Sequence, residues 1–409
     1  MIKHAWFKAT LAIAVATASS QLMANGLAVN EQSASGMGTS FAGRSSSAQD
    51  ASTVFGNPAG MSRLKRAEIS GGAAAIWPET DIEASESNPG SGTNKGDIAP
   101  DAVVPFAYYV RPVNEKWHVG LGLYVPFGVI SDYEKSFQGR DQGLYSKVQV
   151  TTLQPTISYR INDRVAVGFG PTINKMDGKL TSRPLTHAGA DSRVRIKGDD
   201  IGYGFNAGVL VDVTDRLAWG LTYHSKVDYT LEGTIDFDGL LGLEAYSGTV
   251  DITTPESVDM SVTYQANDKW TLYAGSTWTR WSRLKEIEVV NDGPLSPSEP
   301  LNWKNTWAHA IGVAYQVTPS VVLRSGFALD ASPTTNEHRT VRIPVSNRKI
   351  YSLGLGWNID QDWTVDVAYA YVDESKGRVN QTNHYTGGNY SAKYDNSAHG
   401  LGVQLTHRF

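Results

Sequence analysis

Apolar side chains alternate with small or polar ones along most of this chain, and this alternation restricts its fold more than any other feature. One face of the stretch 201–213 carries Ile201, Tyr203, Phe205, Ala207, Val209, Val211 and Val213. The stretches 117–127, 217–224, 351–357 and 399–409 follow the same rule. A period of two residues is typical of β-strands with one apolar face, so we predict an all-β protein.

Two kinds of connection separate the alternating stretches. Six are short and polar, at residues 113–116, 162–164, 214–216, 267–269, 318–320 and 359–362. Seven are longer, near residues 79–99, 128–144, 182–199, 237–247, 290–304, 331–347 and 375–396. Thirteen connections join fourteen strands. An even strand number, with short turns at one end and long loops at the other, is typical of bacterial outer-membrane barrels, so we predict a transmembrane antiparallel β-barrel.

Aromatic residues support a membrane location. Trp117, Trp219, Trp270 and Trp363 follow the short turns closely, as expected of an aromatic ring at the bilayer surface. The last alternating strand ends in Phe409, which resembles the signal read by the outer-membrane assembly machinery, although His407 replaces a more usual aromatic. The alternative is a soluble sandwich or propeller, in which loops do not sort so regularly into short and long sets.

The N-terminus predicts export. Lys3 and Lys8 precede a small, apolar run at residues 10–18, and Ala24 offers a cleavage point. That run is far below the ~20 residues of a membrane-spanning helix, so residues 1–24 are interpreted as a signal peptide. Its removal leaves 34 basic and 41 acidic residues, which gives no reason to expect a nucleic-acid partner. The chain contains no cysteine, which excludes disulfides and thiol chemistry.

Residues 25–65 do not follow the strand pattern. They are rich in Ser, Gly and Ala, and they precede a first strand expected near Ala67. A segment of ~40 residues is too small for a core of its own, so it either hangs in the periplasm or plugs the lumen of a barrel formed by residues 66–409. Without a plug, fourteen strands would enclose a sizeable pore.

Several motifs resemble a known family. The stretch 26–36, Asp50-Ala51 and Asn57-Pro58-Ala59 are similar to the N-terminal hatch of FadL-type long-chain fatty acid transporters. Tyr124-Val125-Pro126-Phe127-Gly128 resembles their third strand, at the point where it kinks. Residues 155–161, 205–208, 278–282 and 330–333 match later strands. The resemblance covers essentially the whole mature chain.

The resemblance implies a monomeric fourteen-stranded barrel whose lumen is plugged by a hatch at residues 25–65. It implies that a hydrophobic ligand is caught at the outer loops, held in the lumen and released sideways at the kinked third strand. The expected function is therefore passive outer-membrane transport of hydrophobic compounds, with long-chain fatty acids as the first choice of substrate. The alternatives are an aromatic-hydrocarbon channel of the same family and a general porin.

The resemblance also implies site residues. The hatch motif is Asn57, Pro58, Ala59 and Gly60, and the kink comprises Tyr124, Val125, Pro126, Phe127 and Gly128. Proline cannot donate a ladder hydrogen bond, so Pro126 either opens a gap or simply ends the strand. Leu27 and Val29 either touch ligand or belong to a flexible leader. The apolar loop residues Phe237, Leu240, Leu241 and Leu243 form either a capture site or a satellite core.

A fatty acid needs a basic partner for its carboxylate. Lys175, Lys179, Arg183, Lys304 and Arg348 are the candidates, but the family's basic residues do not map onto them clearly. This gap weakens the fatty-acid hypothesis relative to a neutral hydrocarbon.

Enzymatic chemistry is not expected. The stretch 38–42 lacks the last glycine of a nucleophile elbow, and the nine histidines form no metal-binding motif. We therefore expect no catalytic residue, metal or cofactor. The expected partners are a hydrophobic small molecule, the lipid bilayer with its lipopolysaccharide, and the assembly machinery.

Overall fold

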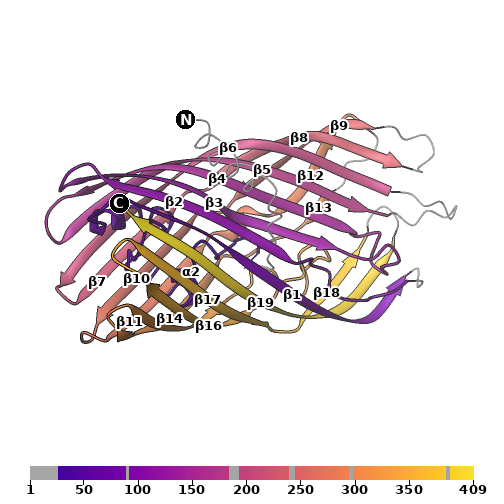
Figure 1. Ribbon diagram of the computed structural model, residues 1–409. Coiled ribbons are helices and arrows are strands. Elements are labelled where there is room, and N and C mark those ends of the chain that lie inside the picture. Colours follow the sequence, from indigo (N-terminus) through magenta and orange to yellow (C-terminus); the bar gives the residue numbers. More distant parts are fainter. Residues whose placement is uncertain (1–25, 89–91, 184–192, 239–244, 294–297, 384–386) are drawn as a thin grey trace, which may run out of the picture.

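The computed structural model describes residues 26–88, 92–183, 193–238, 245–293, 298–383 and 387–409. The predicted signal peptide, residues 1–24, lies outside them. The described residues form one antiparallel sheet of 19 labelled strands that closes on itself (Figure 1). In this part of the chain no helix has both the length and the apolar character needed to cross a bilayer.

Within the described residues the labelled strands make up fourteen barrel strands, as predicted. Nine are continuous: β1 (Glu68–Asn88), β2 (Ala102–Pro112), β3 (Trp117–Asp132), β4 (Tyr145–Arg160), β5 (Val165–Ser182), β6 (Arg193–Thr214), β15 (Val321–Asp330), β16 (Arg348–Asn358) and β19 (Asn389–Arg408). Five are interrupted: β7 (Leu217–His224) with β8 (Val227–Asp238), β9 (Tyr246–Thr254) with β10 (Ser257–Gln265), β11 (Trp270–Thr279) with β12 (Glu286–Asn291), β13 (Ser298–Pro300) with β14 (Thr306–Thr318), and β17 (Trp363–Glu374) with β18 (Gly377–Thr382). The two halves of an interrupted strand share a neighbour, as β7 and β8 share β6.

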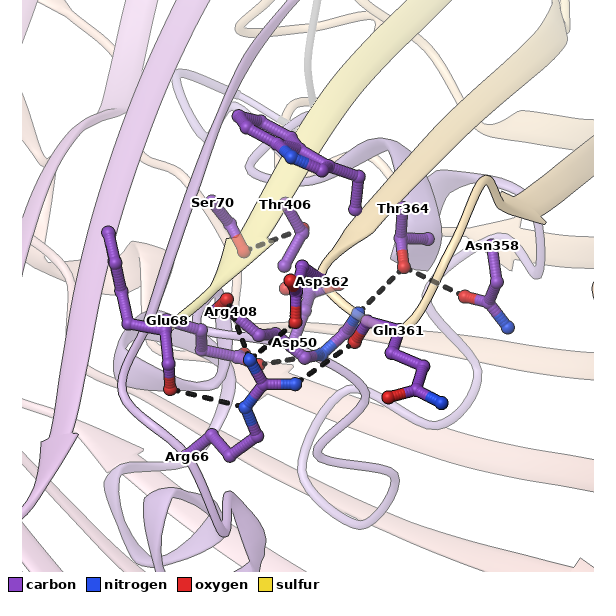
Figure 2. Close-up of polar contacts among 12 residues, drawn as sticks. Asp50, Arg66, Glu68, Ser70, Asn358, Gln361, Asp362, Thr364, Thr406 and Arg408 are labelled. Carbon is purple, nitrogen blue, oxygen red and sulfur yellow. Dashed lines mark hydrogen bonds and ion pairs between the residues drawn. The ribbon is translucent and has the colours of Figure 1, made fainter.

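The barrel closes where β1 pairs with β19, from Glu68↔Arg408 to Asn88↔Asn389. Figure 2 shows the short-turn end of this seam. The Arg66 guanidinium donates to the backbone oxygens of Phe409 (3.1 Å) and Arg408 (3.0 Å) and pairs with the Asp362 carboxylate at 2.5 Å. Arg408 in turn pairs with Glu68 at 3.2 Å. These bonds hold the first and last strands together, and closure removes the sheet edges that lipid could not satisfy.

All six predicted short turns are present, and one local interaction explains them. A side-chain oxygen in each turn accepts hydrogen bonds from two backbone amides that follow it; these acceptors are Asn114, Asn162, Thr214, Asn267, Thr318 and Asp360. Asn, Asp and Thr favour tight turns through this bond.

The strands extend further at the opposite, outer end than the sequence predicts. β1 runs to Asn88, inside the predicted loop 79–99, and β19 begins at Asn389, inside the predicted loop 375–396. Above the bilayer both faces of a strand meet water, so the apolar members of the alternation disappear while the hydrogen-bond ladder continues. The predicted loop boundaries at these positions were therefore wrong.

The outward face is apolar where it meets lipid. Phe169, Ile201, Tyr203 and Leu353 are between 47% and 73% exposed, and Trp117 and Trp270 lie beside the short turns. The inward face is built mainly of small and polar residues, as the alternation requires.

Residues 26–64, here called the N-terminal segment, pack against the inner wall. The segment contains α2 (Ala34–Met37), α3 (Thr53–Gly56) and the 3₁₀ helix η1 (Pro58–Arg63). A methyl group added to Gly168 of β5 would lie 2.3 Å from the carbonyl carbon of Pro58. One added to Gly220 of β7 would lie 1.8 Å from the Ser45 oxygen, and one added to Gly326 of β15 2.2 Å from Thr39. Glycines around the barrel therefore let the segment's backbone lie directly on the wall.

A substitution at one of these glycines tests the packing. We expect Gly168→Ala to destabilise the folded protein by about 1–3 kcal/mol, because overpacking against a fixed backbone forces a local shift. Gly71→Ala is the matched control, since its nearest neighbouring atom would lie at 3.9 Å. The check is thermal unfolding in detergent, and equal midpoints for both variants would contradict the packing described.

Candidate functional site

The third barrel strand, β3, is irregular in its middle. Its register with β4 runs to Tyr124↔Thr152 and resumes at Phe127↔Val150. Val125 and Pro126 therefore lie opposite Thr151 alone, which is a β-bulge. Pro126 has no N–H to donate, and bulges are among the few places where a sheet tolerates proline.

The ladder between β2 and β3 stops just before this bulge. It extends from Pro112↔His118 to Ala107↔Leu123 and no further. In the described part of the chain, residues 102–106 of β2 then pair with β1 alone. We call the unpaired region between residues 102–106 and residues 124–128 the β2–β3 gap.

The N-terminal segment fills this gap. Ala28 forms an isolated antiparallel bridge with Phe127. The Val29 amide donates to the Pro126 oxygen at 2.8 Å, and the Gly128 amide donates to the Leu27 oxygen at 2.8 Å. Residues 27–29 thus satisfy backbone groups of β3 that β2 leaves unpaired, as buried polar groups require.

Side chains hold the same stretch from both strands. Val29 is 3% exposed and belongs to an apolar cluster with Val104 of β2 and Val125 of β3. The Gln32 side-chain amide donates to the backbone oxygen of Val125 at 2.6 Å, and the Tyr108 hydroxyl donates to the backbone oxygen of Gln32 at 3.0 Å. The stretch is thereby tied to β2 and β3 together.

A cavity of about 150 Å³, here called the lumen cavity, lies beside the gap. Its lining includes residues of the N-terminal segment and of the bulge itself. The apolar lining residues that matter below are Val29, Phe41, Phe55, Pro126, Phe127 and Ile350. Because Val29, Pro126 and Phe127 line the cavity and also border the gap, the two are adjacent.

Arg44 is the one Lys or Arg among the described residues that line this cavity. Its guanidinium lies 4.9 Å from the Phe41 ring centre and 5.9 Å from that of Phe55, and it donates to Asn30 Oδ1 at 3.0 Å. Cation–π contacts hold such a group without neutralising it.

Glu31 also faces the lumen cavity. Burial raises the pKa of the Glu31 carboxyl, while the positive charges of Arg348 and Arg44 act in the opposite direction. The cavity therefore combines apolar walls with one guanidinium, from Arg44, and three carboxyl groups, from Glu31, Asp259 and Asp330. A lining that is both apolar and charged suits an amphipathic ligand.

The Asn57-Pro58-Ala59-Gly60 motif lies away from the cavity and anchors the N-terminal segment. Asn57 Nδ2 donates to the oxygens of Ser45 (2.6 Å) and Val209 (3.0 Å), and its Oδ1 accepts from the Ala59 amide at 3.0 Å. Pro58 occupies the start of η1, where its missing N–H costs nothing. Asn57 thus ties the segment both to itself and to β6.

The predicted ligand contacts separate in the structure. Val29 lines the lumen cavity, whereas Leu27 is buried in an apolar cluster nearer the outer end. Phe237 belongs to that same cluster and packs edge-on against Tyr246, 6.1 Å between ring centres. Leu240, Leu241 and Leu243 lie outside the described residues.

The basic candidates for a carboxylate partner do not lie in the lumen cavity. Lys175 and Lys179 are on the outward face of β5, where Lys175 pairs with Asp177 at 3.5 Å. Lys304 is exposed, Arg183 follows the outer end of β5, and Arg348 pairs with the buried Asp330. Their assignment to the lumen was wrong for Lys175 and Lys179, because the period of β5 turns its odd-numbered residues outward.

Arg44 was missed because the N-terminal segment has no periodicity from which to read a face. The available signal was its rarity, since Glu31, Arg44, Asp50 and Arg63 are the charged residues between positions 26 and 64. A charge kept in a small-residue segment that packs inside a barrel requires a partner or a function.

A second, smaller cavity lies nearer the outer end. Its volume is about 40 Å³, and its lining is almost entirely aliphatic, from β4, β5, β6, β8, β9 and β12. We call it the outer cavity; its main lining residues are Val148, Leu180, Ile196, Leu231, Ile235, Val250, Ile252, Ile287 and Val289.

Comparison with known proteins gives a consistent picture. Residues 15–409 match the family model described as outer membrane protein transport protein (OMPP1/FadL/TodX). The chain is 30% identical to the putative outer membrane protein NMB0088 of Neisseria meningitidis, over 100% of both chains. It is 26% identical to the long-chain fatty acid transport protein of Escherichia coli K12, over 93% of this chain and 94% of that one. A crystal structure of a Pseudomonas aeruginosa FadL homologue superposes with a TM-score of 0.85 at 24% identity, covering 94% of this chain and 100% of that chain.

Proposed function

The chain belongs to the OMPP1/FadL/TodX family of outer membrane transport proteins, and from this premise we propose that it carries long-chain fatty acids passively across the outer membrane. In this proposal the outer and lumen cavities hold the ligand in turn, and the β2–β3 gap releases it sideways into the bilayer. The N-terminal segment acts as the hatch that blocks the axial route.

The lateral route rests on the missing ladder between β2 and β3. Along residues 118–123 of β3, where β2 is paired, a ligand would have to break strand-to-strand hydrogen bonds in a low-dielectric wall. At the gap, the two backbone hydrogen bonds that form the Ala28–Phe127 bridge close the wall. A shift of residues 27–29 would therefore open a path that is bordered by Val104 and Val125 and continuous with lipid.

The fatty-acid substrate rests on Arg44. A neutral hydrocarbon has no use for a guanidinium in a cavity with apolar walls, and such a charge is costly to keep there even with Glu31 facing the same cavity. A carboxylate would accept a charge-assisted hydrogen bond from it. The acyl chain would then contact Phe41, Phe55 and Ile350.

Energetically this route needs no ATP and no coupling ion. Each transfer of the acyl chain from water to a cavity, and finally to the bilayer, is favoured by roughly 25 cal/mol per Å² of apolar surface buried. Consumption of the fatty acid inside the cell would give the flux its direction.

A general porin is a poorer fit to the lumen. A porin conducts through an open, charged constriction, whereas residues 26–64 here lie across the lumen on a ring of glycines. Aromatic-hydrocarbon uptake remains the family's other substrate class and is separated from fatty-acid uptake by the experiments below.

An engineered disulfide tests lateral release. Ala28 and Phe127 are opposite residues without mutual backbone hydrogen bonds, a pairing that brings Cα atoms to about 4.5 Å, which suits a disulfide. In the otherwise cysteine-free chain, we expect oxidised A28C/F127C to lose most oleate uptake and to recover it on reduction. The assay is radiolabelled oleate uptake by Gram-negative cells that lack their own fatty acid transporter.

Each single-cysteine variant serves as the control and should be insensitive to oxidant. Equal uptake by the oxidised and reduced double variant would rule out release through the β2–β3 gap. It would leave binding in the lumen cavity untouched.

Substitution of Arg44 tests the substrate class. We expect Arg44→Gln to weaken oleate binding roughly 10- to 100-fold, because a charge-assisted hydrogen bond is lost, and to leave toluene binding unchanged. Titration of the purified protein with both compounds measures this difference. If both affinities stay the same, Arg44 does not recognise a carboxylate, and the hydrocarbon alternative gains support.

A further inference from the structure

The connection between β15 and β16, residues 331–347, turns into the barrel mouth instead of projecting from it. Val341 and Val345 are completely buried, and Ile343 is nearly so. All three belong to the apolar cluster that fills the outer part of the barrel, together with Tyr133 and Tyr394. This connection therefore behaves as core, although it has no regular secondary structure.

Arg342 bonds this connection to strands on different sides of the barrel mouth. Its Nη1 donates to Ser146 Oγ at 3.0 Å and to the Thr181 oxygen at 3.1 Å, on β4 and β5. Its Nε donates to the Glu299 carboxylate of β13 at 2.9 Å. β4 and β5 are the fourth and fifth barrel strands and β13 belongs to the tenth, so one guanidinium joins distant sides of the mouth.

The other ties to the barrel also use side chains. The Tyr133 hydroxyl donates to the Val341 oxygen at 2.6 Å, and the Val341 amide donates to Gln381 Oε1 at 2.7 Å. Asn396 Nδ2 donates to the Pro344 oxygen at 2.9 Å. Among the described residues, no backbone ladder joins residues 334–346 to a strand. Residues 334–346 can therefore leave their place without breaking the sheet, while backbone hydrogen bonds at Ala331, Pro333 and Asn347 hold the two ends of the connection.

We propose that residues 331–347 form a lid over the outer end of the lumen, latched by Arg342, which must open before a ligand reaches the lumen cavity. The lid is distinct from residues 27–29, which close the exit at the β2–β3 gap. Two closures in series allow the ligand to be held while neither side is open. The gating role rests on the proposed transport function, whereas the opening itself does not.

Cysteine reactivity measures the opening without any substrate. In purified Val341→Cys protein, we expect a water-soluble maleimide to react at a measurable rate, although the residue is completely buried when the lid is closed. The matched control is Val110→Cys, equally buried but in β2 and paired on both sides, which should stay unlabelled. Adding Arg342→Gln should raise the Val341→Cys rate about tenfold or more, because charge-assisted hydrogen bonds are lost. Adding Arg378→Gln instead, on the exposed face of β18 beside the lid, should leave the Val341→Cys labelling rate unchanged.

A tether then separates gating from transport. A side chain at Gly143 would lie 3.0 Å from Val341 Cγ2, so oxidised G143C/V341C holds the lid shut. We expect it to stop oleate uptake by cells, with recovery on reduction. The lid would be overturned if Val341→Cys reacted with the maleimide no faster than Val110→Cys. It would also be overturned if adding Arg342→Gln left the Val341→Cys rate unchanged. If the oxidised tether left oleate uptake unchanged, the gating role of the lid would be overturned. If Val341→Cys is labelled but the reduced G143C/V341C protein takes up no oleate, the result counts against the transport proposal and leaves the lid standing.

Discussion

The closed hydrogen-bond ladder is the constraint on which the rest of this structure depends. Lipid offers no partner to a backbone N–H or C=O, so every barrel strand must pair on both sides. The seam between β1 and β19 meets this requirement over the whole length of β1, and Arg66 locks its end (Figure 2). The β2–β3 gap departs from it, and residues 27–29 supply the missing partners.

The N-terminal segment contacts the barrel wall in two physically different ways. Around most of the barrel, the segment rests on glycines such as Gly168 and Gly220, where any side chain would collide with its backbone. At the gap it is held by a single bridge and by side chains such as Gln32. Most of the segment is therefore fixed, while the stretch that borders both the lumen cavity and the bilayer is held by few bonds. Such an arrangement allows local movement without loss of the fold.

The sequence predicted the strands well because their alternation and turns are local signals. Asn114 and Asp360 mark their turns by hydrogen bonds within three residues, and Phe169 to Ile173 show their face by period alone. Pro126 marked the irregular strand, but the loss of pairing with β2 is a relation between distant residues that no local pattern carries.

Arg44 and the lid could not be predicted for the same reason. The surroundings of Arg44 are set by Phe41 and Phe55 in an aperiodic segment, and the inward turn of residues 331–347 depends on acceptors on β4, β5 and β13. The outer ends of strands were underestimated because polar residues on both faces conceal a ladder that continues above the bilayer.

The central claim is that a ligand leaves this barrel through its wall. A photoreactive oleate analogue, activated in cells during uptake and mapped by mass spectrometry of the purified protein, tests it most directly. The account predicts adducts in the lumen cavity, at Phe41 or Phe55, and on the bilayer side of the gap, at the outward-facing Val103. Adducts in the cavity and at the short turns, with none beside the gap, would show axial passage to the periplasm and contradict it.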